Sequence, residues 1–366
     1  MTTDPSLDII VPVWNSPAET QACLASILSS STSARLILIN NGCNRTTELM
    51  LEAFCEHLGD RAIYMGMERN IGFVPAINRA LVRSDAHWAL LVRPNTIITA
   101  RCLQQIIQAT TQERAGIILP HCPTESPLPT HLKKHVCTCI ESSELNFSVL
   151  AISKIMREVI GLFDESLDGN IWCLKDYRQR ANANDFRTYL LPSALMTTGT
   201  TIMLGSEERR RKQNELAAAT FRQRWGEQHH FAVYLPKETD QQLLLDTLEY
   251  LLTGARNGNR FDLFLHQRQY RTAITEHNAA CRHSNIILHG LSAFMPLRSL
   301  AKSMRQLTKQ NPALRPVCGL DGTAFPGYDS LLTARTLQFQ VKQYGGPNAS
   351  DDCPTTAGTP TATQAG

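Results

Sequence analysis

Residues 7–13 read LDIIVPV, an apolar run that is rich in β-branched side chains and is bounded by polar residues. An uninterrupted run of this kind is typical of a strand that is buried on both faces of a parallel sheet. Pro17 follows shortly afterwards, and proline is favoured at the first position of a helix. The segment therefore predicts a buried strand that leads directly into a helix.

The same strand-then-helix pattern repeats over the first 230 residues. It predicts further strands at 35–40, 61–66, 88–92, 115–119 and 147–153, and helices at 46–58, 73–83, after Thr99, and at 206–225. Strands that alternate with helices predict a mostly parallel sheet with helices on both faces. Ligands bind such a sheet at the carboxyl ends of its strands, so the residues that follow each apolar run are the candidates for a site.

Composition sets the limits on what the chain does. Its 366 residues are 43% hydrophobic, which is enough to bury the core of one large domain or two ordinary ones. The net charge of +3 is mild and scattered, so we expect no nucleic-acid partner. No stretch approaches the ~20 apolar residues that cross a bilayer, and the first residues lack the features of a signal peptide. We therefore expect a cytoplasmic protein.

The cysteines do not indicate a disulfide framework. The chain has 11 of them, an odd number spread along its length, which favours reduced thiols. One cluster, HLKKHVCTC at 131–139, could bind a metal ion. It lacks paired C-x-x-C spacing, so a polar surface loop is favoured over zinc, and we predict no metal site there.

The remainder of the chain falls into two parts. Leucines at 243–252, and the segment AFMPLRSLAKSMRQL at 293–307, recur at helical spacing. We therefore predict a helical C-terminal region over 231–343, which either covers the sheet or binds a protein partner. Residues 344–366 are mostly Gly, Pro, Ser, Thr and Ala, which predicts a disordered tail.

Seven short segments carry a resemblance to a known family. In order and spacing, DIIVPVWN, INNGCN, ERNIGFVPAINRAL and LLVRPNT resemble the nucleotide half of family-2 glycosyltransferases, and NIGFVPAIN matches the family pattern N-x-G-F-x-x-A-x-N at every fixed position. VIGLFDESL, LLPSAL and FRQRWG are similar to later segments of the family. The resemblance covers about residues 5–230. It implies the GT-A fold, an α/β fold with a Rossmann-like, mostly parallel sheet flanked by helices.

The resemblance also implies an activity and a set of binding residues. The expected reaction moves a sugar, with inversion, from a nucleotide-diphosphate donor (a UDP- or dTDP-sugar) to a hydroxyl of a glycan or lipid-linked acceptor. Gly72 permits close backbone approach to a nucleotide, and asparagine amides offer donors and acceptors, with Asn40 placed to accept a bond from the pyrimidine ring. The positions implied for the donor are Pro12, Asn15, Asn40, Asn70, Gly72, Asn78, Arg93 and Asn95.

The fourth strand tip departs from the family. Family members commonly carry Asp-x-Asp there, whose carboxylate holds a divalent cation against the diphosphate. Here Arg93 and Asn95 stand at these positions. Arg93 would repel a cation, so a normal Mn²⁺ or Mg²⁺ site is not expected. Arg93 could instead bind the diphosphate through its guanidinium; the alternative is a surface arginine without a role.

The acceptor half departs as well. The family motif E-D-x-D-x-x-x-R includes the general base. One register keeps Asp176 and Arg180 and puts Cys173 and Leu174 at the first pair; a shift of two residues puts Lys175 and Asp176 there. Under both registers Asp176 is the candidate base. Thr198 stands where the family often has a histidine.

Three interpretations of function remain open. The first is a transferase with an altered mechanism that needs no metal. The second is a noncatalytic relative that binds a sugar nucleotide or a protein, and the third is a self-associating structural component. A carboxylate from residues 173–176 that points into the cleft would favour the first interpretation, and Leu174 pointing there would favour the second.

Overall fold

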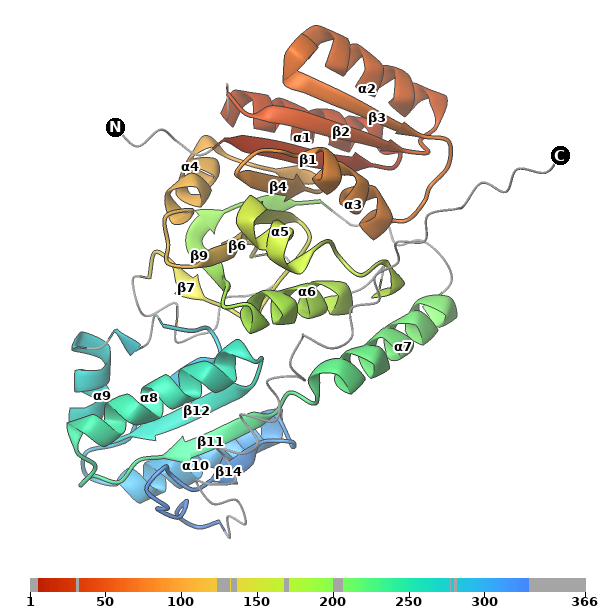
Figure 1. Cartoon of the computed structure of the whole chain (residues 1–366). Helices are drawn as coiled ribbons and strands as arrows, with labels where there is room; N and C mark the ends of the chain where they lie inside the picture. Colours follow the sequence, from red (N-terminus) through yellow and green to blue (C-terminus); the bar gives the residue numbers. More distant parts are fainter. Residues whose placement is uncertain are drawn as a thin grey trace, which may run out of the picture.

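The computed structural model describes residues 6–30, 33–123, 132, 137–167, 171–199, 207–276, 278–279 and 282–328. An eight-stranded and a four-stranded sheet, each with its own helices, and a small two-stranded sheet organise these residues (Figure 1). Within the described parts of the chain, no helix is long and apolar enough to span a membrane. The predicted tail at 344–366 lies outside the described residues.

The larger sheet has eight strands in the order β3-β2-β1-β4-β8-β6-β9-β7. The first four run parallel to one another, as do β6 and β9, whereas β8 and β7 run antiparallel to their neighbours. The prediction of a mostly parallel sheet is confirmed. The strands are β1 (Leu7–Val13), β2 (Arg35–Asn41), β3 (Ala62–Met67), β4 (Trp88–Val92), β6 (Ala115–His121), β7 (Ile140–Glu141), β8 (Val149–Ser153) and β9 (Arg187–Leu195).

Helices cover both faces of this sheet. Successive residues of β1 point to opposite sides, so that Ile9 and Val11 pack in one apolar cluster and Ile10 packs in the other. The first cluster lies under α1 (Pro17–Ser30), α2 (Arg45–Leu58) and α4 (Ala100–Ala109). The second lies under α3 (Phe73–Arg83), α5 (Lys154–Ile160), α6 (Ile171–Ala183) and α7 (Glu207–Trp225). The elements predicted for this half begin and end within two residues of the observed ones.

The helical region predicted for 231–343 requires correction. Its helices are present, but they cover a second sheet of four parallel strands in the order β13-β12-β11-β14. The strands are β11 (His230–Tyr234), β12 (Arg260–Leu265), β13 (Ile286–Gly290) and β14 (Arg315–Val317). The helices are α8 (Gln241–Arg256), α9 (Gln267–Thr275) and α10 (Pro296–Gln310). In Figure 1 this unit lies below the larger sheet, and α7 runs down to it.

A buried charged group helps to explain why this sheet was missed. Asp262, in the middle of β12, is 0% exposed and accepts hydrogen bonds from Nε2 of His230 and, at 2.6 Å, from Nε2 of His289. Burial opposes ionisation, but these two bonds outweigh it and lower the pKa of Asp262 to about 2. Since each strand is short and three of them carry the charged or histidine side chains of this network, the leucine-rich helices dominate the apolar pattern.

The prediction of reduced cysteines needs one correction. Cys137 is disulfide-bonded, whereas the other eight cysteines of the described residues are reduced thiols. Of the sequence cluster weighed as a zinc site, both histidines lie outside the described residues. Within the described residues, no group of three His, Cys, Asp or Glu side chains is placed to hold a metal ion.

Candidate donor site at the carboxyl edge of the larger sheet

The tips of β1 and β2 are tied together by a side chain. Asn15, with φ 57°, accepts a hydrogen bond at Oδ1 from the backbone N–H of Asn44 at 2.8 Å. The N–H of Asn15 in turn reaches Sγ of Cys43 at 3.2 Å. Asn15 therefore lies at the predicted edge and shapes it. Pro12, by contrast, is buried inside β1, so its side chain is not presented at the edge as predicted.

Asn40 does not present the free acceptor that was expected for a pyrimidine ring. The side chain is 3% exposed. Its Oδ1 accepts from the N–H of Cys43 and its Nδ2 donates to Oη of Tyr64, both at 2.8 Å. Because both ends of the amide are engaged within the protein, Asn40 holds Tyr64 and the β2 tip in place. The prediction of direct base recognition by Asn40 is corrected accordingly.

The loop before α3 is fixed to the β2 tip. Gly72 adopts φ 103°, and its N–H donates to Oδ1 of the exposed Asn70 at 2.9 Å. The buried Asn41 donates to the carbonyl of Gly72 at 3.0 Å and accepts from the N–H of Ile71 at 3.1 Å. Asn41 was not predicted as a site residue, although it directly follows Asn40 at the strand tip.

A second glycine, Gly42, is required because the loop after β2 closely approaches the loop before α3. A Cβ on Gly42, which has φ 71°, would lie 2.3 Å from the backbone carbon of Arg69. A larger residue at this position would push the 69–72 loop away from the edge. Gly42 thus belongs with Gly72 as a residue that permits the loop arrangement, and sequence reasoning found only Gly72.

Asn78 is buried and its amide is bonded within the protein, so its predicted contact with the nucleotide is corrected. The side chain is 4% exposed and links α3 to the segment 163–165. Its Nδ2 donates to the carbonyl of Phe163 and to Oε1 of Glu165, both at 2.9 Å, and its Oδ1 accepts from the N–H of Phe163 at 3.1 Å. Asn78 thus links two of the segments that carry the family resemblance, NIGFVPAIN and GLFDES, by hydrogen bonds.

The fourth strand tip forms a corner with a distant segment. Strand β5 (Thr96–Ile97) pairs antiparallel with β10 (Thr197–Thr198). Asn95 donates from Nδ2 to the carbonyl of Gly199 at 3.0 Å, and the N–H of Gly199 donates back to the carbonyl of Asn95 at 2.8 Å. The corner therefore brings Asn95 beside Thr198, the position at which the resemblance implies a histidine.

Arg93 is held at this corner by an aromatic ring. Its guanidinium carbon lies 5.4 Å from the ring centroid of Phe73, a distance at which a cation is attracted to the ring face. Since Phe73 begins α3 directly after Gly72, the contact joins the tip of β4 to the loop after β3. Both are part of the predicted donor edge.

One carboxylate near this corner was missed from the sequence. Oε1 of Glu19, in the first turn of α1, lies 3.9 Å from the point that a Cβ on Gly199 would occupy. Nothing in the local sequence indicates this placement, because it arises from the packing of α1 against the corner. Glu19 adds an acidic side chain to a corner that otherwise carries Arg93 and Asn95.

Asp176 is not placed as a catalytic base, which corrects that prediction. The side chain is 1% exposed. Its Oδ2 accepts from Nε of Arg180 at 2.9 Å, and its Oδ1 accepts from Nε1 of Trp225 at 2.9 Å and from Nη1 of Arg224 at 3.3 Å. A base must come within hydrogen-bond reach of the acceptor hydroxyl. Asp176 instead fastens the end of α7 to α6.

The structure favours one of the two registers considered for the acceptor motif. Asp176 and Arg180 form an ion pair one helical turn apart, as expected if they are the last two fixed residues of that motif. Cys173 and Leu174 then take the first two places, and they are 0% and 1% exposed within the apolar core. Neither a carboxylate nor Leu174 from this turn faces an open cleft.

These features define an α/β protein with the GT-A arrangement, a mostly parallel sheet with helices on both faces and loops gathered at its carboxyl edge. Residues 8–160 match the family described as glycosyl transferase family 2. The match covers less than half of the chain and lies within the part that carries the larger sheet.

The chain is similar to several solved structures. The structure of GalNAc-T7 with UDP, GalNAc and Mn²⁺ is similar at 10% identity and a TM-score of 0.52, over 86% of this chain and 60% of that chain. The mannosyltransferase PcManGT from Pyrobaculum calidifontis, in complex with GDP-Man and Mn²⁺, has 13% identity and a TM-score of 0.49, over 96% and 88%. S. aureus TarS 1-349 with UDP-GlcNAc has 15% identity and a TM-score of 0.46, over 58% and 66%. No curated protein matches the sequence.

Proposed function

We propose that the chain binds a UDP- or dTDP-sugar at the carboxyl edge of the larger sheet and transfers the sugar, with inversion, to a hydroxyl of a glycan or lipid-linked acceptor. The family match over residues 8–160 supports the reaction class. The observation that carries the donor site is the corner of Arg93, Asn95 and β10, next to the loop that begins α3.

In this proposal Arg93 stands at the position where family members commonly carry a metal-binding carboxylate, and its guanidinium supplies the positive charge that the metal ion would supply. A guanidinium presents its donors in a planar fork that fits two phosphate oxygens, and its charge offsets the charge that develops on the leaving diphosphate. The contact with Phe73 holds the side chain at the strand tip. The chain's own residues thus supply the positive charge, and Mn²⁺ or Mg²⁺ is not needed for donor binding.

A second function in the same family is favoured by the burial of Asp176. A displacement at the sugar needs a base at the acceptor hydroxyl, and the described part of α6 supplies none because Asp176 is bound by Arg180 and Trp225. The second candidate is therefore a domain that binds the sugar nucleotide without transferring the sugar.

Calorimetric titration with UDP, dTDP and GDP, each with and without Mn²⁺, tests the donor site. We expect UDP or dTDP to bind without metal. Arg93→Ala should weaken this binding by about tenfold, because a hydrogen-bonded charge pair with phosphate is lost, and leave binding of the bare nucleoside unchanged. Arg83→Ala is the matched control, since Arg83 is exposed in the last turn of α3, at the opposite edge of the sheet. Equal losses of nucleotide and nucleoside binding, or no loss, would remove Arg93 from the diphosphate role.

Transfer and simple binding are separated by a second measurement. The wild-type protein is incubated with radiolabelled UDP-sugars and with glycan or lipid-linked acceptors. Label in the acceptor supports the transferase. Binding of the UDP-sugar without transfer or hydrolysis supports the binding domain.

A further inference from the structure

The two sheets are joined by a polar contact between α6, β7 and the end of α8. Glu141 of β7 accepts two hydrogen bonds of 2.6 Å from the guanidinium of Arg256, the last residue of α8. Gln179 of α6 donates to the carbonyl of Asn257 at 2.9 Å, and Asn182 donates to its side chain at 2.8 Å. These bonds fix the second sheet against the acceptor half of the first.

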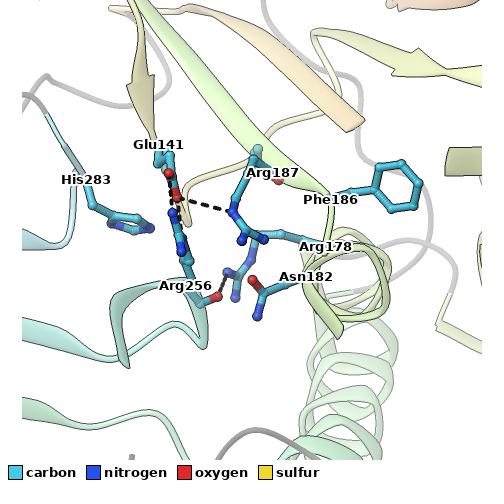
Figure 2. Close-up of a pocket in the computed structure, with 9 residues that line it drawn as sticks. Glu141, Arg178, Asn182, Phe186, Arg187, Arg256 and His283 are labelled. Carbon is cyan, nitrogen blue, oxygen red and sulfur yellow. Dashed lines mark hydrogen bonds and ion pairs between the residues drawn. The ribbon is translucent and has the colours of Figure 1, made fainter. Parts of the chain in front are cut away.

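A small cavity of about 10 Å³ lies inside this joint. Figure 2 shows that Arg178, Arg187, Arg256, Glu141 and His283 converge on it, whereas Phe186 points away. A cavity of this size holds one particle of about the size of a water molecule. Three of the converging side chains are guanidinium groups.

Arg178 is the most deeply buried of the three. The residue is 3% exposed, and its Nη1 donates to the carbonyl of Arg256 at 2.6 Å and to Oγ of Ser143 at 3.3 Å. Its buried Nε finds no hydrogen-bond acceptor, and no carboxylate lies within 4.0 Å of the guanidinium, among the residues that the structure describes. Burial lowers the pKa of Arg178 to about 10, so the group still carries its charge at neutral pH.

The charges around the cavity do not balance. Arg256 is matched by Glu141, and Arg187 by Asp185 at 2.6 Å. His283 is 1% exposed, and burial together with the nearby guanidinium groups lowers its pKa well below the usual value, so it is neutral at pH 7. Arg178 therefore leaves one uncompensated positive charge in a buried place, and such charges are normally paired.

A second buried arginine shows a different solution. Arg157 is 8% exposed and donates to the carbonyls of Leu81, Ser84 and Ala86, at 2.9, 3.2 and 3.2 Å, around the end of α3. Three carbonyl dipoles thus surround that guanidinium, although its Nε, like that of Arg178, finds no acceptor among the described residues. Arg178 has one carbonyl and one hydroxyl, and it has a cavity at its side.

We propose that this cavity binds a single small monovalent anion of the chloride type, which stabilises the joint between the two sheets. The cavity's volume fits a monatomic ion and is too small for phosphate. Its charge matches the excess of one at Arg178. The carboxylate of Glu141 also lines the cavity, but both of its oxygens are bound by Arg256, which offsets its repulsion of an anion.

Thermal unfolding in sodium chloride and in sodium gluconate, at equal ionic strength, tests the proposal. We expect a melting temperature that is higher in chloride by about 2–4 °C, because the ion binds the folded state. Arg178→Gln should remove this difference. Arg45→Gln, a change on the exposed face of α2, should retain it and so corrects for general salt effects. An equal response to chloride in the two variants would overturn the proposal.

A measurement on the wild-type protein decides the matter if Arg178→Gln does not fold. Crystals grown in sodium bromide should show an anomalous peak in the cavity beside Arg178. Density without anomalous signal would identify the occupant as water and overturn the proposal. The test does not involve nucleotide binding, so its outcome is independent of the proposed transferase function.

Discussion

Asn70 and Asn78 belong to the same motif and do different work. Asn70 is exposed at the carboxyl edge and accepts hydrogen bonds from Gly72 and Asn41, which shape the loop beside the proposed donor. Asn78 is 4% exposed, and its amide joins α3 to Phe163 and Glu165. A fixed position in a motif thus indicates that its side chain is required. The side chain can be required to bind a ligand, to hold a loop or to link elements in the core.

The charged residues at the two ends of the site differ in the same way. Arg93 lies at a strand tip over an aromatic ring, where a diphosphate can reach it in the proposed mode of binding. Asp176 is enclosed by Arg180, Arg224 and Trp225. The donor half of the site therefore keeps side chains at the surface, and the described acceptor half uses its one carboxylate on α6 as a structural clamp.

The largest effect expected from this comparison is on stability, at Asp176. Asp176→Ala leaves Nε of Arg180 and the indole N–H of Trp225 without their acceptor in a buried place, so the free energy of unfolding should fall by about 3–5 kcal/mol. Urea unfolding measures the loss, and titration with UDP should give an unchanged affinity. Asp60→Ala, at an exposed position, should change the free energy of unfolding by less than about 0.5 kcal/mol. A variant as stable as wild type that has lost sugar transfer would restore Asp176 as a base.

A smaller loss is expected at Asn78. Asn78→Ala leaves the N–H and carbonyl of the buried Phe163 without partners, which should cost about 2 kcal/mol of unfolding free energy. Because the side chain is buried and bonded to Phe163 and Glu165, the dissociation constant for UDP should not change. A weaker affinity for UDP at wild-type stability would put Asn78 back at the donor.

Much of the larger sheet could be predicted from the sequence. Long β-branched runs such as 7–13 show their burial directly, and their helices show clear apolar faces. The second sheet could not, because strands of three to six residues that include Asp262 or His289 lack a continuous apolar run.

The site was predicted less completely, for a physical reason. The motif located the edge, and Gly72, Arg93 and Asn95 lie there. The hydrogen-bond partners of Asn40, Asn78 and Asp176 lie 3 to 87 residues away in sequence, so one chain without its fold does not reveal them. Glu19 reaches the corner only through the packing of α1.

The smallest loss of stability among the three site variants, and the sharpest form of the comparison, is expected at Asn70. Asn70→Ala removes an exposed acceptor, so the free energy of unfolding should fall by only about 1 kcal/mol, less than for the same substitution at Asn78. The loop around Gly72 would lose an anchor, however, and the dissociation constant for UDP should rise by about three- to tenfold, since the loop must be ordered when the nucleotide binds. Asn78→Ala should therefore be the less stable of the two variants, whereas Asn70→Ala should be the one with the weaker affinity for UDP. If both lose stability and affinity in the same proportion, the edge and the core of this motif are not separate in function, and the donor does not lie against the Asn70 loop.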